Sequence, residues 1–62
     1  MPKSWKELRE ERGIPVSFVA KLLGVNPQTV RNKEKGLSEF DWIQASKLLK
    51  LYRIDISEVK QD

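Results

Sequence analysis

Four polar side chains between residues 28 and 35 could form hydrogen bonds with the edges of stacked bases. Gln28, Arg31, Asn32 and Lys35 recur at intervals of three, four and seven residues, which places them on one face if the segment is helical. The amide groups of Gln28 and Asn32 can each form two hydrogen bonds with adenine N6 and N7, and the Arg31 guanidinium can form two with guanine O6 and N7. A solvated surface with no partner would also accept these residues, so both interpretations stay open at this point.

The segment that carries these residues, "NPQTVRNKEKG", is predicted to be a short helix with clear ends. Asn26 is a favoured N-cap, and Pro27 fits the first helical position, where its missing N–H is not needed. Gly36 suits the residue that follows a helix. Between these signals only Val30 is apolar, on the side opposite the polar face. A helix that buries so little must be held in place by its neighbours.

The element that must position this helix lies directly before it in the chain. Val16, Val19, Ala20 and Leu23 form one apolar stripe, and Gly24 is a natural stop, so a helix is expected over about residues 16–23. Only "GVN" joins the two helices. Two short helices meeting across a short turn that contains glycine form a helix-turn-helix, here at about residues 16–35. In that motif the second helix enters the major groove of DNA, which explains a helix with one apolar anchor and a polar outer face.

Three more helices are expected around this pair. Ser4 opens a capping box for the first helix, and Gly13 ends it. A fourth helix begins near Asp41, and a single-turn fifth follows Asp55. The apolar residues at helical spacing in the fourth are Trp42, Ala45, Leu48, Leu49 and Tyr52. The stretch "YRIDISEV" alternates briefly and is the one place where a strand could form.

We therefore predict an all-α fold of five helices in one domain spanning residues 1–62. The side chains expected inside are those that align on one stripe of each helix. They are Trp5, Leu8, Val19, Ala20, Leu23, Val25, Val30, Ala45, Leu48 and Leu49.

The composition argues against enzymatic chemistry. The chain has no histidine and no cysteine, which removes the usual general base, the thiol nucleophile and the zinc ligands. Its carboxylates are scattered or serve as helix caps. We expect no enzyme activity, no metal site, no cofactor and no small-molecule ligand. No apolar run approaches membrane-spanning length and no signal peptide precedes "MPKSWKELREER", so a cytoplasmic protein is expected.

The positive charge is concentrated in the middle of the chain. The net charge is only +3, but residues 12–36 carry five basic side chains and one acidic one. A local basic surface favours a polyanionic partner, although a solvated face with no partner is an equal alternative on charge alone.

The stretch "LREERGIPVSFVAKLLGVNPQTVRNKEKG" resembles the helix-turn-helix core of the phage lambda-repressor and Cro family. The features that carry the resemblance are Arg9, Ala20, Gly24 and the Glu34-Lys35-Gly36 end of the recognition helix. The similarity continues through "DWIQASKLLKLYRIDISEV", so it covers nearly the whole chain. It implies a Cro-like transcriptional regulator, a repressor of phage or prophage type, that binds double-stranded operator DNA at the nucleoid of a bacterial or phage-infected cell.

The resemblance also implies roles for individual residues. Gln28 and Asn32 are the expected base readers, together with Arg31 and Pro27, whose ring could meet a thymine methyl. Arg9 and Glu34 are expected to form a structural ion pair. Contacts to the DNA backbone are assigned to Ser17, Lys21, Thr29, Lys33, Lys35 and Ser38. A weak homodimer is expected through Phe40, Ile43, Ile56 and Val59.

The chain departs from the family pattern at three positions. Val16 replaces a glutamine that contacts the DNA backbone, Lys33 replaces a large apolar residue, and Phe40 replaces a proline. Val16 and the modest net charge support an alternative function. In that alternative the fold serves as a protein-interaction module, such as an antitoxin-like or antirepressor partner, without specific DNA binding.

Overall fold

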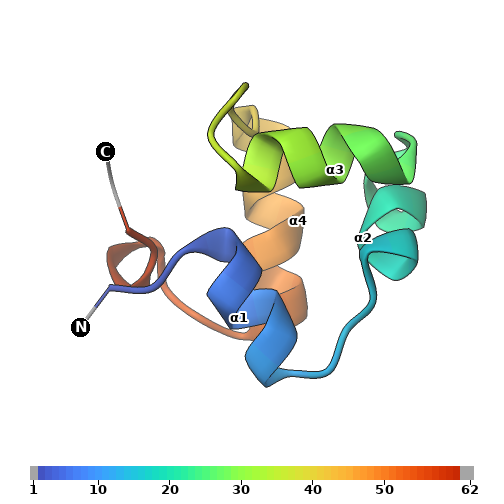
Figure 1. Cartoon of the computed structure of the whole chain (residues 1–62). Helices are drawn as coiled ribbons and strands as arrows, with labels where there is room; N and C mark the ends of the chain where they lie inside the picture. Colours follow the sequence, from blue (N-terminus) through green and yellow to red (C-terminus); the bar gives the residue numbers. More distant parts are fainter. Residues whose placement is uncertain (1, 61–62) are drawn as a thin grey trace.

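The computed structural model describes residues 2–60. Four α-helices surround a small core: α1 (Trp5–Glu11), α2 (Val16–Leu23), α3 (Pro27–Glu34) and α4 (Trp42–Tyr52). In Figure 1, α3 lies across the top of the molecule and α4 runs behind it from top to bottom, with α2 on the right and α1 at the lower left. The all-α class predicted from the sequence is confirmed for the described residues.

Local sequence signals set the ends of these helices. The Ser4 hydroxyl accepts from the Glu7 N–H, and the Asp41 carboxylate accepts from the Gln44 N–H, each in a complete capping box. Asn26 caps α3 by accepting from the Thr29 N–H at 2.9 Å. Gly24 ends α2 in the left-handed conformation with φ of 72°, which glycine adopts without strain.

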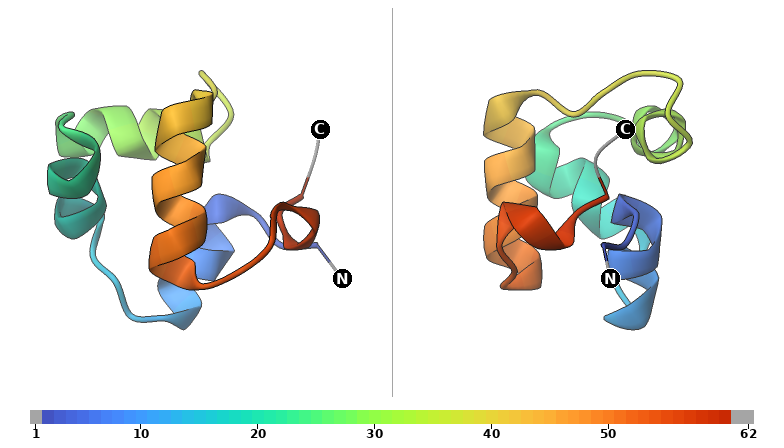
Figure 2. Two further views of the ribbon diagram at one scale, coloured as in Figure 1. Left: turned by 180° about the vertical axis from the view of Figure 1, so that it is seen from behind. Right: turned by 90° about the vertical axis from the view of Figure 1, so that its left-hand side faces the viewer.

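The predicted fifth helix is not an α-helix. Residues Ile56–Glu58 form a three-residue 3-10 turn, η1, so the described chain has four α-helices and not five. Val59 leaves the turn in an extended conformation and forms a single parallel bridge with Lys3. The backbone bonds from Lys3 N to Glu58 O and from Lys60 N to Lys3 O measure 3.0 and 2.8 Å. This pairing with the start of the chain ends the turn, and Figure 2 shows the two segments side by side.

The core lies where the four helices meet. Six of the predicted residues are buried, and Trp5, Leu23, Val25 and Leu49 are half-buried against them. Tyr52 and Val59 are also buried, each with about 2% of its surface exposed. The six buried residues that were predicted are Leu8, Val19, Ala20, Val30, Ala45 and Leu48.

Trp42 is the main departure from the predicted apolar stripes. It occupies the first position of α4 and is 74% exposed. Phe40, just before the helix, instead turns inward, and its ring packs edge-on against Trp5 with ring centroids 5.5 Å apart. The loop before α4 therefore supplies the aromatic side chain for the core, and the helix presents its own to solvent.

Candidate nucleic-acid interface

The anchoring of α3 begins with one side chain and one turn. Val30 is fully buried, and the Val25 N–H donates to the Ala20 carbonyl at 3.0 Å across the Gly24 corner. α2 and α3 pack directly against each other. The corner therefore fixes the direction in which α3 leaves α2, and Val30 fixes its rotation.

The predicted ion pair between Arg9 and Glu34 is present and ties α1 to the end of α3. Arg9 Nε and Nη2 donate to the two Glu34 carboxylate oxygens at 2.8 and 3.2 Å, and Nη1 donates to the Ile14 carbonyl at 3.0 Å. The two side chains are only 11% and 4% exposed. Hydrogen bonding to Glu34 raises the pKa of Arg9 and outweighs the opposing effect of burial. A two-pronged pair of this kind holds a fixed orientation as well as a distance.

A second tether comes from Lys33. Its ammonium donates to the Glu39 carbonyl at 2.8 Å and lies 5.9 Å from the centre of the Phe40 ring. The lysine that replaces an apolar residue therefore fastens the end of α3 to the loop that follows it. Its predicted contact with the DNA backbone would compete with this bond.

The outer face of α3 carries the predicted base readers. Pro27, Gln28 and Arg31 are exposed, and Asn32 is partly exposed. Gln28 Nε2 donates to Asn32 Oδ1 at 3.0 Å, so the two amides form a linked pair. Gln28 keeps its carbonyl oxygen and its second N–H free for a partner, because an amide group has two donors and one acceptor oxygen.

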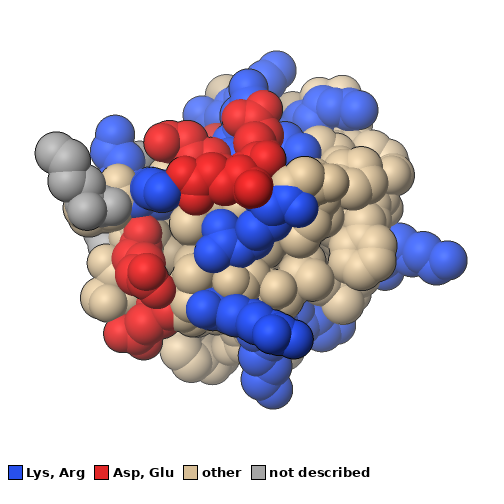
Figure 3. Space-filling model, turned by 90° about the horizontal axis from the view of Figure 1, so that it is seen from below, with Lys and Arg blue, Asp and Glu red and all other residues tan. Residues whose placement is uncertain are grey.

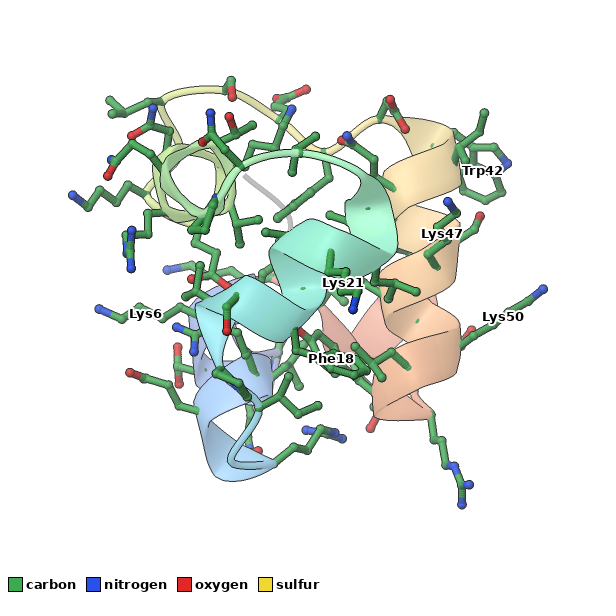
Figure 4. All side chains as sticks on the ribbon, turned by 90° about the vertical axis from the view of Figure 1, so that its right-hand side faces the viewer. Lys6, Phe18, Lys21, Trp42, Lys47 and Lys50 are labelled. Carbon is green, nitrogen blue, oxygen red and sulfur yellow. The ribbon has the colours of Figure 1, made fainter. Side chains whose placement is uncertain are left out.

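The predicted backbone-contact residues fall in several places. The Thr29 hydroxyl donates to Asn26 Oδ1 at 3.1 Å, so it takes part in the cap of α3. Ser17 is exposed near the start of α2. Lys33, Lys35 and Ser38 line a hollow of about 410 Å³ that also reaches η1. Lys21 lies apart from them, on the side of α2 that Figure 4 shows next to α4.

Sequence reasoning missed Lys6, which joins the residues of α3 in space. Lys6, Arg31 and Lys35 line a recess of about 150 Å³ together with Val16 and the Arg9–Glu34 pair. We call the recess that these three cations line the basic recess. Lys6 precedes Arg9 by one helical turn, so once Arg9 was expected to reach α3, the spacing could have placed Lys6 there as well.

Other parts of the surface have mixed charge. Seen from below in Figure 3, acidic and basic side chains lie next to each other. Glu11 pairs with Lys3 and lies 3.8 Å from Arg12, so charges near the end of α1 are partly balanced. Among residues 2–60, Arg31, Lys33 and Lys35 form no ion pair, and the partner of Lys33 is the Glu39 carbonyl.

The predicted dimer residues differ in exposure. Val59 is buried where it pairs with Lys3, and Phe40 is half-buried against Trp5. The interface stays a prediction. Ile43 and Ile56 are exposed, 67% and 40% respectively.

Residues 2–60 contain no group of three or more acidic side chains that could hold a metal ion. In the same range, no helix has the length and apolar character needed to cross a membrane.

Comparison with protein families gives one match. A family model described as helix-turn-helix, of the lambda-repressor and Cro-like type, matches residues 6–59. The match runs from the first turn of α1 to the Val59 bridge and contains the whole of α2 and α3. No curated protein and no solved structure matches the chain.

Proposed function

Because this chain belongs to the lambda-repressor and Cro-like helix-turn-helix family, we propose that it represses transcription by inserting α3 into the major groove of a specific operator. Membership in the family indicates a DNA-binding transcriptional regulator. The observation that carries the finer proposal is the contrast across α3. One side holds the fully buried Val30, and the other presents Gln28, Arg31 and Asn32 to solvent on a helix that is tethered at both ends.

Gln28 is the main base reader in this proposal, and Asn32 orients it. A glutamine that binds adenine uses its oxygen and one N–H, and the other N–H remains available. In the structure, one N–H of the Gln28 amide donates to Asn32 Oδ1 at 3.0 Å. Adenine would use the other N–H, so both bonds can form together. The pair therefore holds the Gln28 amide in place before DNA arrives, which lowers the entropy lost on binding.

The basic recess gives the complex its affinity for any duplex. Lys6, Arg31 and Lys35 come from two helices and converge on one hollow. Cations at such a point would neutralise phosphates and release counterions, so their contribution would be independent of sequence and sensitive to salt. Arg31 is also within the polar face of α3, and we propose that it turns to guanine when the sequence offers one.

Selection of bound duplexes from a random library tests the proposal first. We expect one enriched site, and we expect Gln28→Ala to weaken binding to it by about 1–3 kcal/mol and to relax the preference at one base pair. Asn32→Ala should show a smaller loss at the same base pair. Enrichment of no site, or equal affinity of Gln28→Ala for the enriched site, would contradict specific readout by α3.

Lys35→Ala separates contact with the DNA backbone from recognition of the bases. We expect it to weaken binding to all duplexes alike and to lower the slope of log affinity against log salt by about one. Lys50→Ala is the matched control, because Lys50 is also an exposed lysine but lies on α4. Equal changes in the two variants would show that net charge, and not the basic recess, governs binding.

We also propose that the protein binds its operator as a weak homodimer. Ile43 and Ile56 are the exposed residues of the predicted interface that could contribute. A symmetric dimer would require a pseudo-palindromic site with half-site centres about one helical turn apart. Sedimentation with and without the selected duplex tests this: a single protein per duplex at saturation would exclude the dimer.

A further inference from the structure

Aromatic and apolar side chains are exposed on a side of the molecule that the DNA proposal does not use. Phe18 and Leu22 lie one helical turn apart on α2 and are 50% and 36% exposed. Trp42 at the start of α4 is more exposed than either. Figure 4 shows Phe18 between α2 and α4 and Trp42 at the outer edge of α4, with α3 on the opposite side of the view. Phe18 and Leu22 form the apolar part of this side, and exposed apolar patches mark interaction surfaces.

Lysines lie on the same two helices as these apolar residues. In Figure 4, Lys21 lies on α2 and Lys47 on α4, and Lys50 extends outward from the edge of α4. None of the three has an acidic partner among residues 2–60, where the ion pairs involve Lys3, Arg9 and Arg12. These lysines make this side basic, and its charge complements an acidic surface.

We propose that this side, which we call the α2/α4 face (Phe18, Lys21, Leu22, Trp42, Lys47 and Lys50), is the docking site for an acidic amphipathic helix of another protein. Such a helix would place apolar residues on Phe18 and Leu22, with Trp42 as the anchor at one edge. Acidic residues on both flanks of the helix would meet Lys21 on one side and Lys47 and Lys50 on the other. A nucleic-acid backbone would match the lysines but would leave Phe18 and Leu22 without apolar contacts.

This inference goes beyond DNA binding by α3, because it assigns a second partner to a different surface. α3 and the α2/α4 face lie on separate sides of α2 in Figure 4. One molecule could therefore hold an operator and a protein partner together, which would place that partner at a chosen site on DNA.

The test uses the whole chain without DNA and a synthetic helical peptide with leucine and phenylalanine on one face and glutamate on both flanks. We expect saturable binding, with changes in amide chemical shift confined to α2 and α4. A second peptide with every glutamate replaced by lysine should bind at least about tenfold more weakly. Binding that is equal for the two peptides, or shift changes centred on α3, would overturn the proposal.

Variants with matched controls locate the site. Trp42→Ser and Lys47→Glu should each weaken peptide binding about tenfold. Leu37→Ser is the control for Trp42, because Leu37 is 73% exposed but lies in the loop after α3. Lys60→Glu is the control for the change of charge, because Lys60 is exposed and lies outside the basic recess and the α2/α4 face. Both controls should bind within about twofold of wild type, and circular dichroism should show the same helix content in all four. Losses as large in the controls would overturn the assignment to this face.

The same titration decides between the protein partner and other anionic partners. Phosphatidylglycerol vesicles and a duplex of random sequence are added in place of the peptide. We expect neither to shift the amides of Phe18, Leu22 and Trp42. The proposal is wrong if either one shifts them and the acidic peptide does not. Since no operator is present, failure of the DNA proposal leaves this result unchanged, and failure here leaves the DNA proposal unchanged.

Discussion

The outer face of α3 and the α2/α4 face are both exposed and both basic, but they differ in every other respect. α3 buries a single residue, Val30, and presents amides and cations on its other side. α2 has the same length and buries Val19 and Ala20 fully, yet exposes Phe18 beside Lys21. The weakly buried helix is the one that is held by an ion pair and a lysine tether. The difference indicates that a polar face requires fixed geometry to select hydrogen-bond partners, whereas an apolar face can gain affinity from burial alone.

Breaking the tether of α3 should produce the largest effect. Arg9→Ala leaves the Glu34 carboxylate buried without its partner, so we expect a loss of about 3 kcal/mol in the free energy of unfolding. Chemical denaturation measures this loss. Arg9→Lys should recover part of it, because an ammonium restores the charge but not the two-pronged geometry. An unchanged midpoint for Arg9→Ala would remove the ion pair from the explanation of how α3 is held.

The second effect separates the two faces directly. Phe18→Ser should leave affinity for the selected duplex within about twofold, whereas Arg31→Ala should lower it by about 1–2 kcal/mol, because Arg31 contributes to both the polar face and the basic recess. Titration with labelled duplex measures both. Equal losses in the two variants would mean that the faces act as one surface.

A third change tests Arg53, the residue that ends α4 and belongs to neither face. Arg53 ends the helix with φ of 57°, a left-handed conformation that glycine adopts more easily than any other residue. Arg53→Gly should therefore stabilise the fold by about 0.5–1 kcal/mol, because the left-handed strain that it relieves exceeds the entropy that glycine adds to the unfolded chain. Arg53→Ala is the matched control, since it removes the same side chain but keeps a Cβ. Equal stability of the two variants would show that the backbone conformation is not the source of the gain.

The smallest effect at neutral pH concerns Tyr52, which is buried in the core. Its hydroxyl has no hydrogen-bond partner among residues 2–60, so Tyr52→Phe should change stability by less than about 1 kcal/mol, in the stabilising direction. Both DNA affinity and peptide affinity should stay unchanged. A loss above 1 kcal/mol would mean that the hydroxyl has a stabilising partner.

The same variant should change the response to alkaline pH. Burial raises the pKa of Tyr52 to about 12, above the value near 10 of an unfolded tyrosine. The folded state therefore holds the phenol proton more tightly, and this stabilisation is complete below about pH 10 and is lost as pH rises toward 12. Tyr52→Phe should lose less stability over that range than wild type. Parallel denaturation midpoints from pH 9 to 12 would contradict the shift.

The sequence predicted the helices well because the signals at their ends are local. Asn26, Pro27 and Gly24 act within one turn, so the limits of α2 and α3 could be placed without knowing the rest of the fold. The Arg9–Glu34 pair was accessible through resemblance to a family, since nothing local connects two residues so far apart in the chain.

Contacts between distant segments were the part that could not be predicted. Val59 was assigned to a surface, but it is buried because the chain end pairs with Lys3. Trp42 fits the apolar stripe of α4 by spacing, yet it is exposed, and Phe40 before the helix packs against Trp5 instead. In each case, the periodicity of the sequence predicts which face of an element is apolar, but it does not predict which other segment packs against that face.

The most direct test is an amide chemical-shift titration of the whole chain with the duplex selected from a random library. If α3 reads the operator, the largest changes will be at Gln28, Arg31 and Asn32, with smaller changes at Lys6 and Lys35 that fade as salt rises. Phe18, Leu22 and Lys47 will stay unchanged. Changes confined to α2 and α4, or no salt-sensitive binding to any duplex, would contradict DNA recognition by α3.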